Sequence, residues 1–255
     1  MSEQILGTVK LTLEPPLAWL TLSRPHKLNA LDRETLEGIA AAAAAVDEQP
    51  EIAVAILSGE GSDFSAGADL RSLADVPADK WLRAIREGAE AGRVATAALR
   101  QMRPITIALA HGRVIGGGMV LVAACDLRVV TEDAVFWLPE VDLGIPVGWG
   151  GVPVLVAELG PSLARDLVLT CRRIGAVELR EAGFVSRLVA PAEAARAARE
   201  LADQIAAKPA GALTRSKQQF LDALDASVSG SASGRSDADL IVAALAESSR
   251  TGLAG

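Results

Sequence analysis

The chain has 255 residues, of which 50% are hydrophobic and 22% charged, so it can bury a sizeable core and is not disordered as a whole. Its 25 Lys and Arg and 32 Asp and Glu residues give a formal net charge of −7. This balance argues against a nucleic-acid-binding protein, because such proteins usually carry a basic surface. Cys125 and Cys171 lie far apart, so we expect no disulfide scaffold and a reducing compartment. With no secretory peptide and no apolar stretch of membrane-spanning length, we expect a cytoplasmic protein that does not enter a membrane.

Buried-strand patterns alternate with helical patterns along the first part of the chain. Strands are predicted at residues 9–13, 18–22, 52–57, 105–110, 127–130 and 135–137, and helices at residues 33–45, 81–102 and 119–124. Asp32 is placed to cap the first helix, with Glu34 in its first turn. Strands that alternate with helices in this way predict an α/β architecture.

The last hundred residues have a different pattern, which is mostly helical. Helices are predicted at residues 163–169, 177–182, 192–207, 213–224 and 237–246, with a short strand at 185–189 and a Ser- and Gly-rich loop at 227–236. We therefore expect an α/β core over residues 1–190 and a helical C-terminal segment over residues 191–255.

Two glycine-rich turns each follow a predicted buried strand. One reads FSAGAD at residues 64–69, and the other reads IGGGM at residues 115–119. Small residues let a ligand approach the backbone, and N–H groups at a helix start can face an anion. Either turn alone is more often a tight turn without a ligand, and neither matches a nucleotide-phosphate motif.

Several segments, taken in order, resemble the crotonase superfamily, also called the enoyl-CoA hydratase/isomerase superfamily. They read SRPHKLNAL at 23–31, FSAGADL at 64–70, HGRVIGGG at 111–118, CD at 125–126 and PEVDLGIP at 139–146, with a weaker match at 183–188. The resemblance implies the crotonase (ClpP-like) fold, a spiral of ββα turns that forms two roughly perpendicular sheets, followed by a helical C-terminal segment. It also implies a homotrimer or a dimer of trimers, with the C-terminal helices at the subunit interface.

The chemistry that the resemblance implies is the stabilisation of a thioester enolate. The backbone N–H groups of Ala68 and Gly117 would form an oxyanion hole around the thioester oxygen of an acyl-CoA. Fixed donors aimed at a developing negative charge are each commonly worth about 3 kcal/mol. For the CoA moiety the resemblance implies Ala66 beside the adenine, the segment Asp69, Leu70 and Arg71, and Lys27 and Arg24 at the phosphates, although both cations could equally be solvated surface charges.

The acid and base residues decide which reaction follows. The hydratase pattern has one glutamate three residues beyond the oxyanion glycine and another in the Pro-Glu segment. Here the first position is Val120 and only the second, Glu140, is acidic. Because moving a double bond needs a single base, we favour an enoyl-CoA isomerase, which the single glutamate also resembles. The alternatives are an enoyl-CoA hydratase, in which Asp142 could assist Glu140, and a noncatalytic acyl-CoA-binding homologue.

Other residues have less specific interpretations. Trp149, flanked by glycines, either forms a wall of the acyl pocket or anchors a helix start by packing. Gly148 stands where the hydrolase branch of the family carries a carboxylate, which disfavours hydrolysis. Lys217 and Phe220 are candidates for contacting CoA or completing a neighbour's pocket. With two histidines and no ligand cluster we expect no metal site, and no cofactor beyond the coenzyme A of the substrate.

Overall fold

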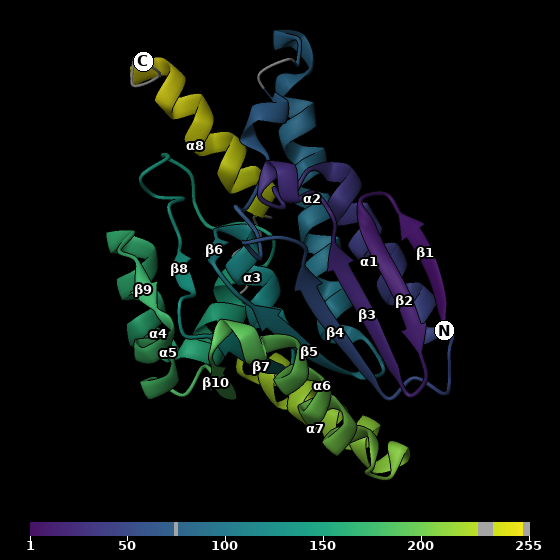
Figure 1. Ribbon diagram of the computed structural model, residues 1–255. Helices are drawn as coiled ribbons and strands as arrows, with labels where there is room; N and C mark the ends of the chain where they lie inside the picture. The colour runs from purple at the N-terminus through teal and green to yellow at the C-terminus, as the bar shows by residue number, and fades with distance from the viewer. Residues whose placement is uncertain (74–75, 229–236, 252–255) are drawn as a thin grey trace.

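The computed structural model describes residues 1–73, 76–228 and 237–251, and within them two β-sheets are packed with helices (Figure 1). The larger sheet has the order β1-β2-β3-β4-β5-β7-β10 and the smaller one β6-β8-β9. Pairing is antiparallel from β1 to β3 and parallel from β3 to β10. The strands are β1 (Ser2–Leu6), β2 (Val9–Glu14), β3 (Leu17–Leu22), β4 (Val54–Gly59), β5 (Ile105–Ala110), β6 (Arg113–Ile115), β7 (Leu127–Thr131), β8 (Val135–Trp137), β9 (Ile174–Gly175) and β10 (Arg187–Val189).

The helices cover both faces of the larger sheet. They are α1 (Arg33–Asp47), α2 (Ala78–Gln101), α3 (Gly117–Ala124), α4 (Gly151–Thr170), α5 (Ala176–Glu181), α6 (Ala194–Ala206), α7 (Ala210–Val228) and α8 (Asp237–Thr251), with short 3-10 helices η1 (Pro25–Lys27), η2 (Leu70–Leu73) and η3 (Pro191–Glu193). α8 follows α7 in the chain but packs beside α2, on the other side of the molecule from α6 (Figure 1). The predicted α/β architecture is confirmed.

The sequence of β4 shows why its sheet is covered on both faces. Successive side chains of a strand point to opposite faces. Val54 and Ile56 pack in the apolar cluster with α6, whereas Ala55 and Leu57 pack in the main core with α1, α2 and α3. A continuous apolar run is what a parallel strand buried on both faces requires.

The structure differs from the predicted elements in several places. β1 was not predicted because its side chains are mostly exposed and carry no apolar alternation. β6 was not predicted because it has only three residues between turns. The helix predicted at 163–169 is the second half of α4, which is kinked at Gly160 (φ +74°) before Pro161. Of the loop predicted at 227–236, residues 227 and 228 end α7 and the others lie outside the described residues.

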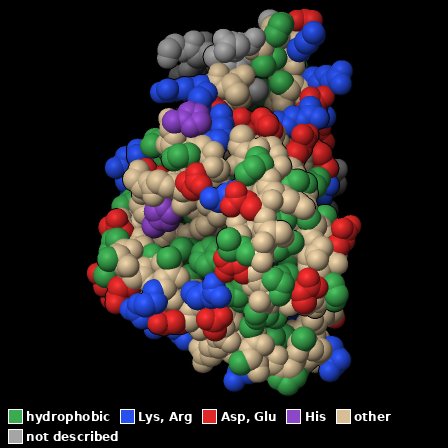
Figure 2. Space-filling view, turned by 45° about the vertical axis from the view of Figure 1, so that its right-hand side comes forward, with side chains coloured by type: hydrophobic (Ala, Val, Ile, Leu, Met, Phe, Trp, Pro, Cys, Tyr) green, Lys and Arg blue, Asp and Glu red, His purple; other side chains and the backbone are tan. Residues whose placement is uncertain are grey.

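The surface carries charges of both signs. On the face shown in Figure 2, acidic and basic side chains are interspersed with apolar ones. No helix in the described ranges is long and apolar enough to cross a bilayer.

Candidate active site

A cavity of about 310 Å³ opens where the two predicted glycine turns meet. Its walls come from the loop after β4, the start of α3, the loop between β8 and α4, and the helices α2 and α8. Most of the predicted site residues line it, namely Ala66, Ala68, Asp69, Leu70, Gly117, Glu140 and Trp149. Lys27 and Arg71 do not line it and are exposed on η1 and η2.

The two glycine turns run side by side as parallel backbone segments. Ser65 pairs with Val114: its N–H donates to the Arg113 carbonyl at 3.0 Å, and its own carbonyl accepts from the Ile115 N–H at 3.0 Å. Ala68 and Gly117 follow this pairing on the two segments, and both line the cavity. A Cβ on Gly67 would lie 2.7 Å from the Ile115 carbonyl oxygen, so the segments stay in contact up to this point and only glycine fits.

The direction of the Ala68 N–H is set by its neighbours on the other side. The Gly67 carbonyl accepts from the Leu31 N–H at 2.8 Å, and the Asp69 N–H donates to the Leu31 carbonyl at 3.0 Å. In a trans peptide the C=O and the following N–H point in opposite directions. The Ala68 N–H therefore points away from Leu31, toward the Gly117 side, and within the described ranges of the chain it has no acceptor.

The Gly117 N–H lies at the N-terminus of α3. The Gly116 carbonyl accepts from the N–H groups of Met119 and Val120, so it points along the helix and the Gly117 N–H points out of the helix end. This N–H also has no acceptor among the described residues, and the helix dipole makes its surroundings favourable for negative charge. A Cβ on Gly117 would overlap the Trp149 ring, so a side chain is excluded there.

Glu140 provides a carboxyl group beside these amides. It follows β8 and begins a turn, in which the Ile145 N–H donates to the Glu140 carbonyl at 2.9 Å. A Cβ on Gly116 would lie 2.8 Å from Glu140 Oε1, so the carboxyl group sits close to the start of α3. Its Oε2 is buried without a hydrogen-bond partner, and burial raises the pKa of Glu140 to about 7. Such a group can accept and return a proton near neutral pH.

The other carboxylates in the described cavity wall are all paired with arginines. Asp32 and Asp69 each lie 3.1 Å from Arg24, and Glu87 lies 2.8 Å from Arg33. Glu140 has no such cation. Among the described lining residues it is therefore the one carboxylate left available for proton transfer.

Two positions considered for a second acid have no carboxylate in the cavity. Val120 lines it with an apolar, buried side chain. Asp142 is exposed and does not line the cavity, because residues 140–144 form turns instead of the extended chain that would place Asp142 on the same side as Glu140. A role for Asp142 in activating water is thus not supported by its position.

Trp149 combines the two roles considered for it. Its indole packs against Gly117 and against Gly92 of α2, where a Cβ on either glycine would overlap the ring. The side chain is only 8% exposed and also lines the cavity. It is therefore both a packing anchor and a wall of the site.

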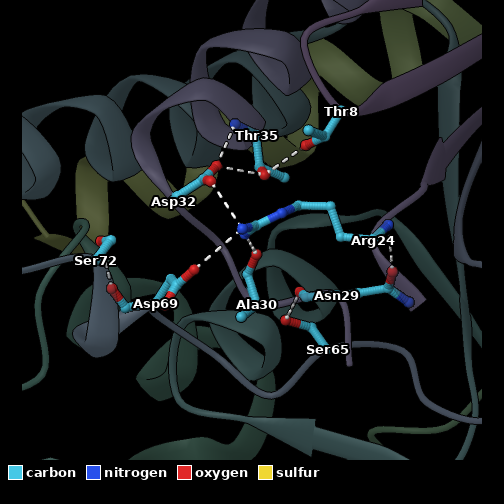
Figure 3. A network of polar contacts seen from close by, with 9 residues as sticks. All are labelled: Thr8, Arg24, Asn29, Ala30, Asp32, Thr35, Ser65, Asp69 and Ser72. Carbon is cyan, nitrogen blue, oxygen red and sulfur yellow. Dashed lines mark hydrogen bonds and ion pairs between the residues drawn. The ribbon is translucent and has the colours of Figure 1, made fainter. Parts of the chain in front are cut away.

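Three other candidates lie outside the cavity of this chain. Arg24 is buried and bound to Asp32 and Asp69, so it cannot serve the phosphates of a ligand (Figure 3). Lys217 is buried in an ion pair with Asp126 at 2.7 Å and donates to the Pro104 carbonyl, away from the cavity. Phe220 on α7 is 72% exposed and does not line the cavity. For Lys217 and Phe220, completing a neighbour's pocket stays a prediction.

Two walls of the cavity were missed by the sequence reasoning. Ile85 and Ala89 of α2 and Ile241 of α8 form an apolar cluster that lines it. The amphipathic pattern of α2 was a usable signal for a buried face, but nothing in the sequence indicated what α8 packs on. Asp237, which begins α8, accepts a hydrogen bond from the Gly150 N–H at 2.5 Å and so holds the helix at the site.

The described residues contain no cluster of His, Cys, Asp or Glu that could hold a metal ion.

Comparison with known proteins agrees with this geometry. Residues 14–253 match the model of the enoyl-CoA hydratase/isomerase family. The chain is 33% identical to a short-chain-enoyl-CoA hydratase of Clostridium acetobutylicum over 84% of this chain and 80% of the relative. It is 31% identical to the peroxisomal Δ(3,5)-Δ(2,4)-dienoyl-CoA isomerase of Arabidopsis thaliana over 89% of this chain and 85% of the relative.

A solved structure shares the same fold. It is a Thermobifida fusca protein in complex with acetoacetyl-CoA, with a TM-score of 0.77 and 27% identity over 98% of this chain and 96% of that one. The predicted fold class is confirmed.

Proposed function

The chain belongs to the enoyl-CoA hydratase/isomerase family of the crotonase superfamily, and from that membership we propose that its cavity binds an acyl-CoA thioester and stabilises the enolate formed from it. The complex of the T. fusca homologue with acetoacetyl-CoA supports this substrate class. The apolar walls from α2 and α8 suit an uncharged acyl group. No cofactor is needed, because coenzyme A is part of the substrate.

In this proposal the thioester oxygen lies between the N–H groups of Ala68 and Gly117. Neither N–H group has an acceptor in the part of the chain that the structure describes, and both residues line the cavity. They are held by backbone hydrogen bonds before substrate arrives, so they stabilise negative charge without reorganising, each by about 3 kcal/mol.

We propose that the reaction is double-bond migration in an enoyl-CoA. The Glu140 carboxylate removes a proton from C2 of a 3-enoyl-CoA, and the electron pair left behind moves onto the thioester oxygen. The protonated Glu140 then returns the proton to C4 as the double bond forms between C2 and C3. The observation that carries this proposal is that Glu140 is the one unpaired carboxylate of the described cavity wall, with Val120 where a second acid would be needed.

Hydration of a 2-enoyl-CoA is the second candidate. It is favoured by the C. acetobutylicum relative, which is named a hydratase. In this chain Glu140 would have to activate the water and also deliver the proton to carbon, since Val120 cannot transfer one.

The two candidates are separated by assaying the purified protein with 3-enoyl-CoA and with 2-enoyl-CoA. Isomerisation of the first without hydration of the second supports the proposal. Robust hydration without isomerisation refutes the isomerase and leaves the hydratase.

The role of Glu140 is tested by comparing Glu140→Gln with Asp142→Asn, two isosteric changes within the same turn. Glu140→Gln should lower kcat by about 10²–10⁴-fold while the protein still binds acyl-CoA. Asp142→Asn should leave kcat unchanged. Deuterium incorporation at the acyl carbons from heavy water excludes a noncatalytic acyl-CoA-binding protein.

Some expectations remain predictions. Ala66, Leu70 and Arg71 are proposed to contact the CoA moiety, with the exposed Lys27 near its phosphates. The assembly is proposed to be a homotrimer or a dimer of trimers, which light scattering after size-exclusion chromatography would measure.

A further inference from the structure

We propose that Arg24 is a positioning residue for the oxyanion hole: its guanidinium binds the residues that flank the Leu31–Ala68 pairing and so fixes the direction of the Ala68 N–H. This inference rests on the proposed function, because it assigns a role within the same site. Arg24 itself does not line the cavity.

The contacts of Arg24 converge on both strands of this pairing (Figure 3). Its Nη2 lies 3.1 Å from Asp69 Oδ2 and 3.1 Å from Asp32 Oδ2, and its Nη1 donates to the Ala30 carbonyl at 2.5 Å. Ala30 and Asp32 stand on either side of Leu31, and Asp69 follows Ala68 directly. One buried side chain therefore connects the two segments whose hydrogen bonds direct the Ala68 amide.

Arg24 is itself held rigidly, so it can serve as a fixed point. Its N–H donates to Asn29 Oδ1 at 2.9 Å, and Asn29 Nδ2 donates to the carbonyls of Glu60 and Asp63, both at 2.8 Å. The Ser65 hydroxyl donates to the Asn29 carbonyl and accepts from the Gly67 N–H. The same network thus reaches the residue before Ala68 from the other side.

The charge of Arg24 matters as well as its shape. Asp69 is buried, and a carboxylate buried without a partner is costly in free energy. It would also repel the negative charge that develops beside Ala68. Arg24 pairs this carboxylate, and its planar fork reaches three acceptors on two segments, which a lysine ammonium cannot match.

The test compares Arg24→Lys and Arg24→Met with the matched pair Arg128→Lys and Arg128→Met. Arg128 is also a buried arginine with a carboxylate partner, Glu158 at 2.5 Å, but its other contacts are the carbonyls of Cys125 and Phe184, away from the Leu31–Ala68 pairing. The readouts are kcat and KM with the active enoyl-CoA at temperatures where each variant is folded, together with the melting temperature. A misplacement of about 1 Å at a catalytic group can cost roughly 10²-fold in rate.

We expect Arg24→Met to lower kcat by about 10²-fold with a smaller change in KM, and Arg24→Lys to recover part of the loss. The Arg128 variants should lose thermal stability but keep kcat. If Arg24→Met does not fold, Arg24→Lys and Asp69→Asn carry the test, since each weakens the same contact and should lower kcat.

Three results would overturn the inference. One is a wild-type kcat in the folded Arg24 variants, and another is an equal loss of kcat in the Arg128 variants. The third is a wild-type protein that turns over no enoyl-CoA, which also refutes the proposed function. Turnover by the wild type together with unaffected Arg24 variants overturns the positioning role alone.

Discussion

Glu140 is buried without a hydrogen bond to Oε2 and without a cation, and this explains how one carboxyl group could serve as base and acid in turn. Its pKa of about 7 means that both protonation states are populated near neutral pH. The free enzyme needs the carboxylate to remove a proton. We therefore expect kcat/KM to rise with pH and to level off above about pH 7, as measured in a pH–rate profile. A rise centred near pH 4.5 would show instead that Glu140 is exposed to solvent.

The same burial predicts a pH-dependent stability. In the unfolded chain Glu140 ionises near its ordinary pKa of 4.5, whereas in the folded protein it keeps its proton up to about pH 7. Stability is therefore lost between these two values, by about 3 kcal/mol at 1.36 kcal/mol per pKa unit. Glu140→Gln should be more stable than the wild type by about this amount at pH 8 and equal to it at pH 4.

Denaturant unfolding at the two pH values measures this difference. Asp142→Asn is the control, because Asp142 is exposed on the same turn and should show no such dependence. An advantage of Glu140→Gln that is the same at both pH values would indicate a packing effect in place of an ionisation.

At the scale of elements, the two central glycines of α2 differ in the space that surrounds them. A Cβ on Gly92 would overlap the Trp149 ring, whereas a Cβ on Gly88 would meet no atom within 4 Å. Gly88→Ala should therefore stabilise the protein by up to about 1 kcal/mol through helix propensity alone. Gly92→Ala should destabilise it by about 1–3 kcal/mol, because the indole must move.

Because Trp149 lies between Gly92 and Gly117, its displacement should also reach the site. We expect Gly92→Ala to lower kcat/KM. Gly88→Ala should change it much less, because it adds one methyl group to the cavity wall without displacing another atom. Thermal unfolding and enzyme kinetics on the same preparations measure both effects. Equal stability of the two variants would show that the Trp149 side chain can adopt another conformation without loss of stability.

The elements that could be predicted from the sequence are those that their own residues specify, through hydrophobic periodicity or a capping residue. The apolar run of β5 and the Asp32 cap of α1, whose side chain accepts from the Thr35 N–H, are local signals. The two glycine turns and Glu140 could be predicted because short motifs carry them, and the structure brings them to one cavity.

Burial of a charged side chain could not be predicted in this way. Nothing in the sequence around Arg24 or Lys217 distinguishes them from cations on the surface. Only tertiary packing pairs Arg24 with Asp69 and Lys217 with Asp126. Asp142 was considered beside Glu140 on the assumption of extended chain, but local turns decided its direction. The ion pairs of Arg24 and Lys217 could not be predicted because partners distant in sequence leave no local pattern.

At the scale of the whole molecule, α8 returns to a cavity whose other walls come from residues 31–149. α8 packs beside α2, and its Ile241 contacts the Gly148 region while Asp237 accepts from the Gly150 N–H (Figure 1). Arg86 of α2 and Asp239 of α8 add an exposed ion pair at 2.8 Å. The binding site is therefore completed only when α8 is docked.

This arrangement predicts that docking of α8 and substrate binding are coupled. Ile241→Asp places a carboxylate in the cluster with Ile85 and Ala89, and burying an unpaired charge costs several kcal/mol, so the helix should undock. Ala243→Asp is the control, because Ala243 lies on the exposed side of the same helix. We expect Ile241→Asp to raise KM and to speed hydrogen exchange in residues 237–251 while β4 and β5 stay protected, and Ala243→Asp to do neither. A raised KM with normal protection of α8 would mean that Ile241 acts only as a contact to the acyl group and that the helix does not need to dock.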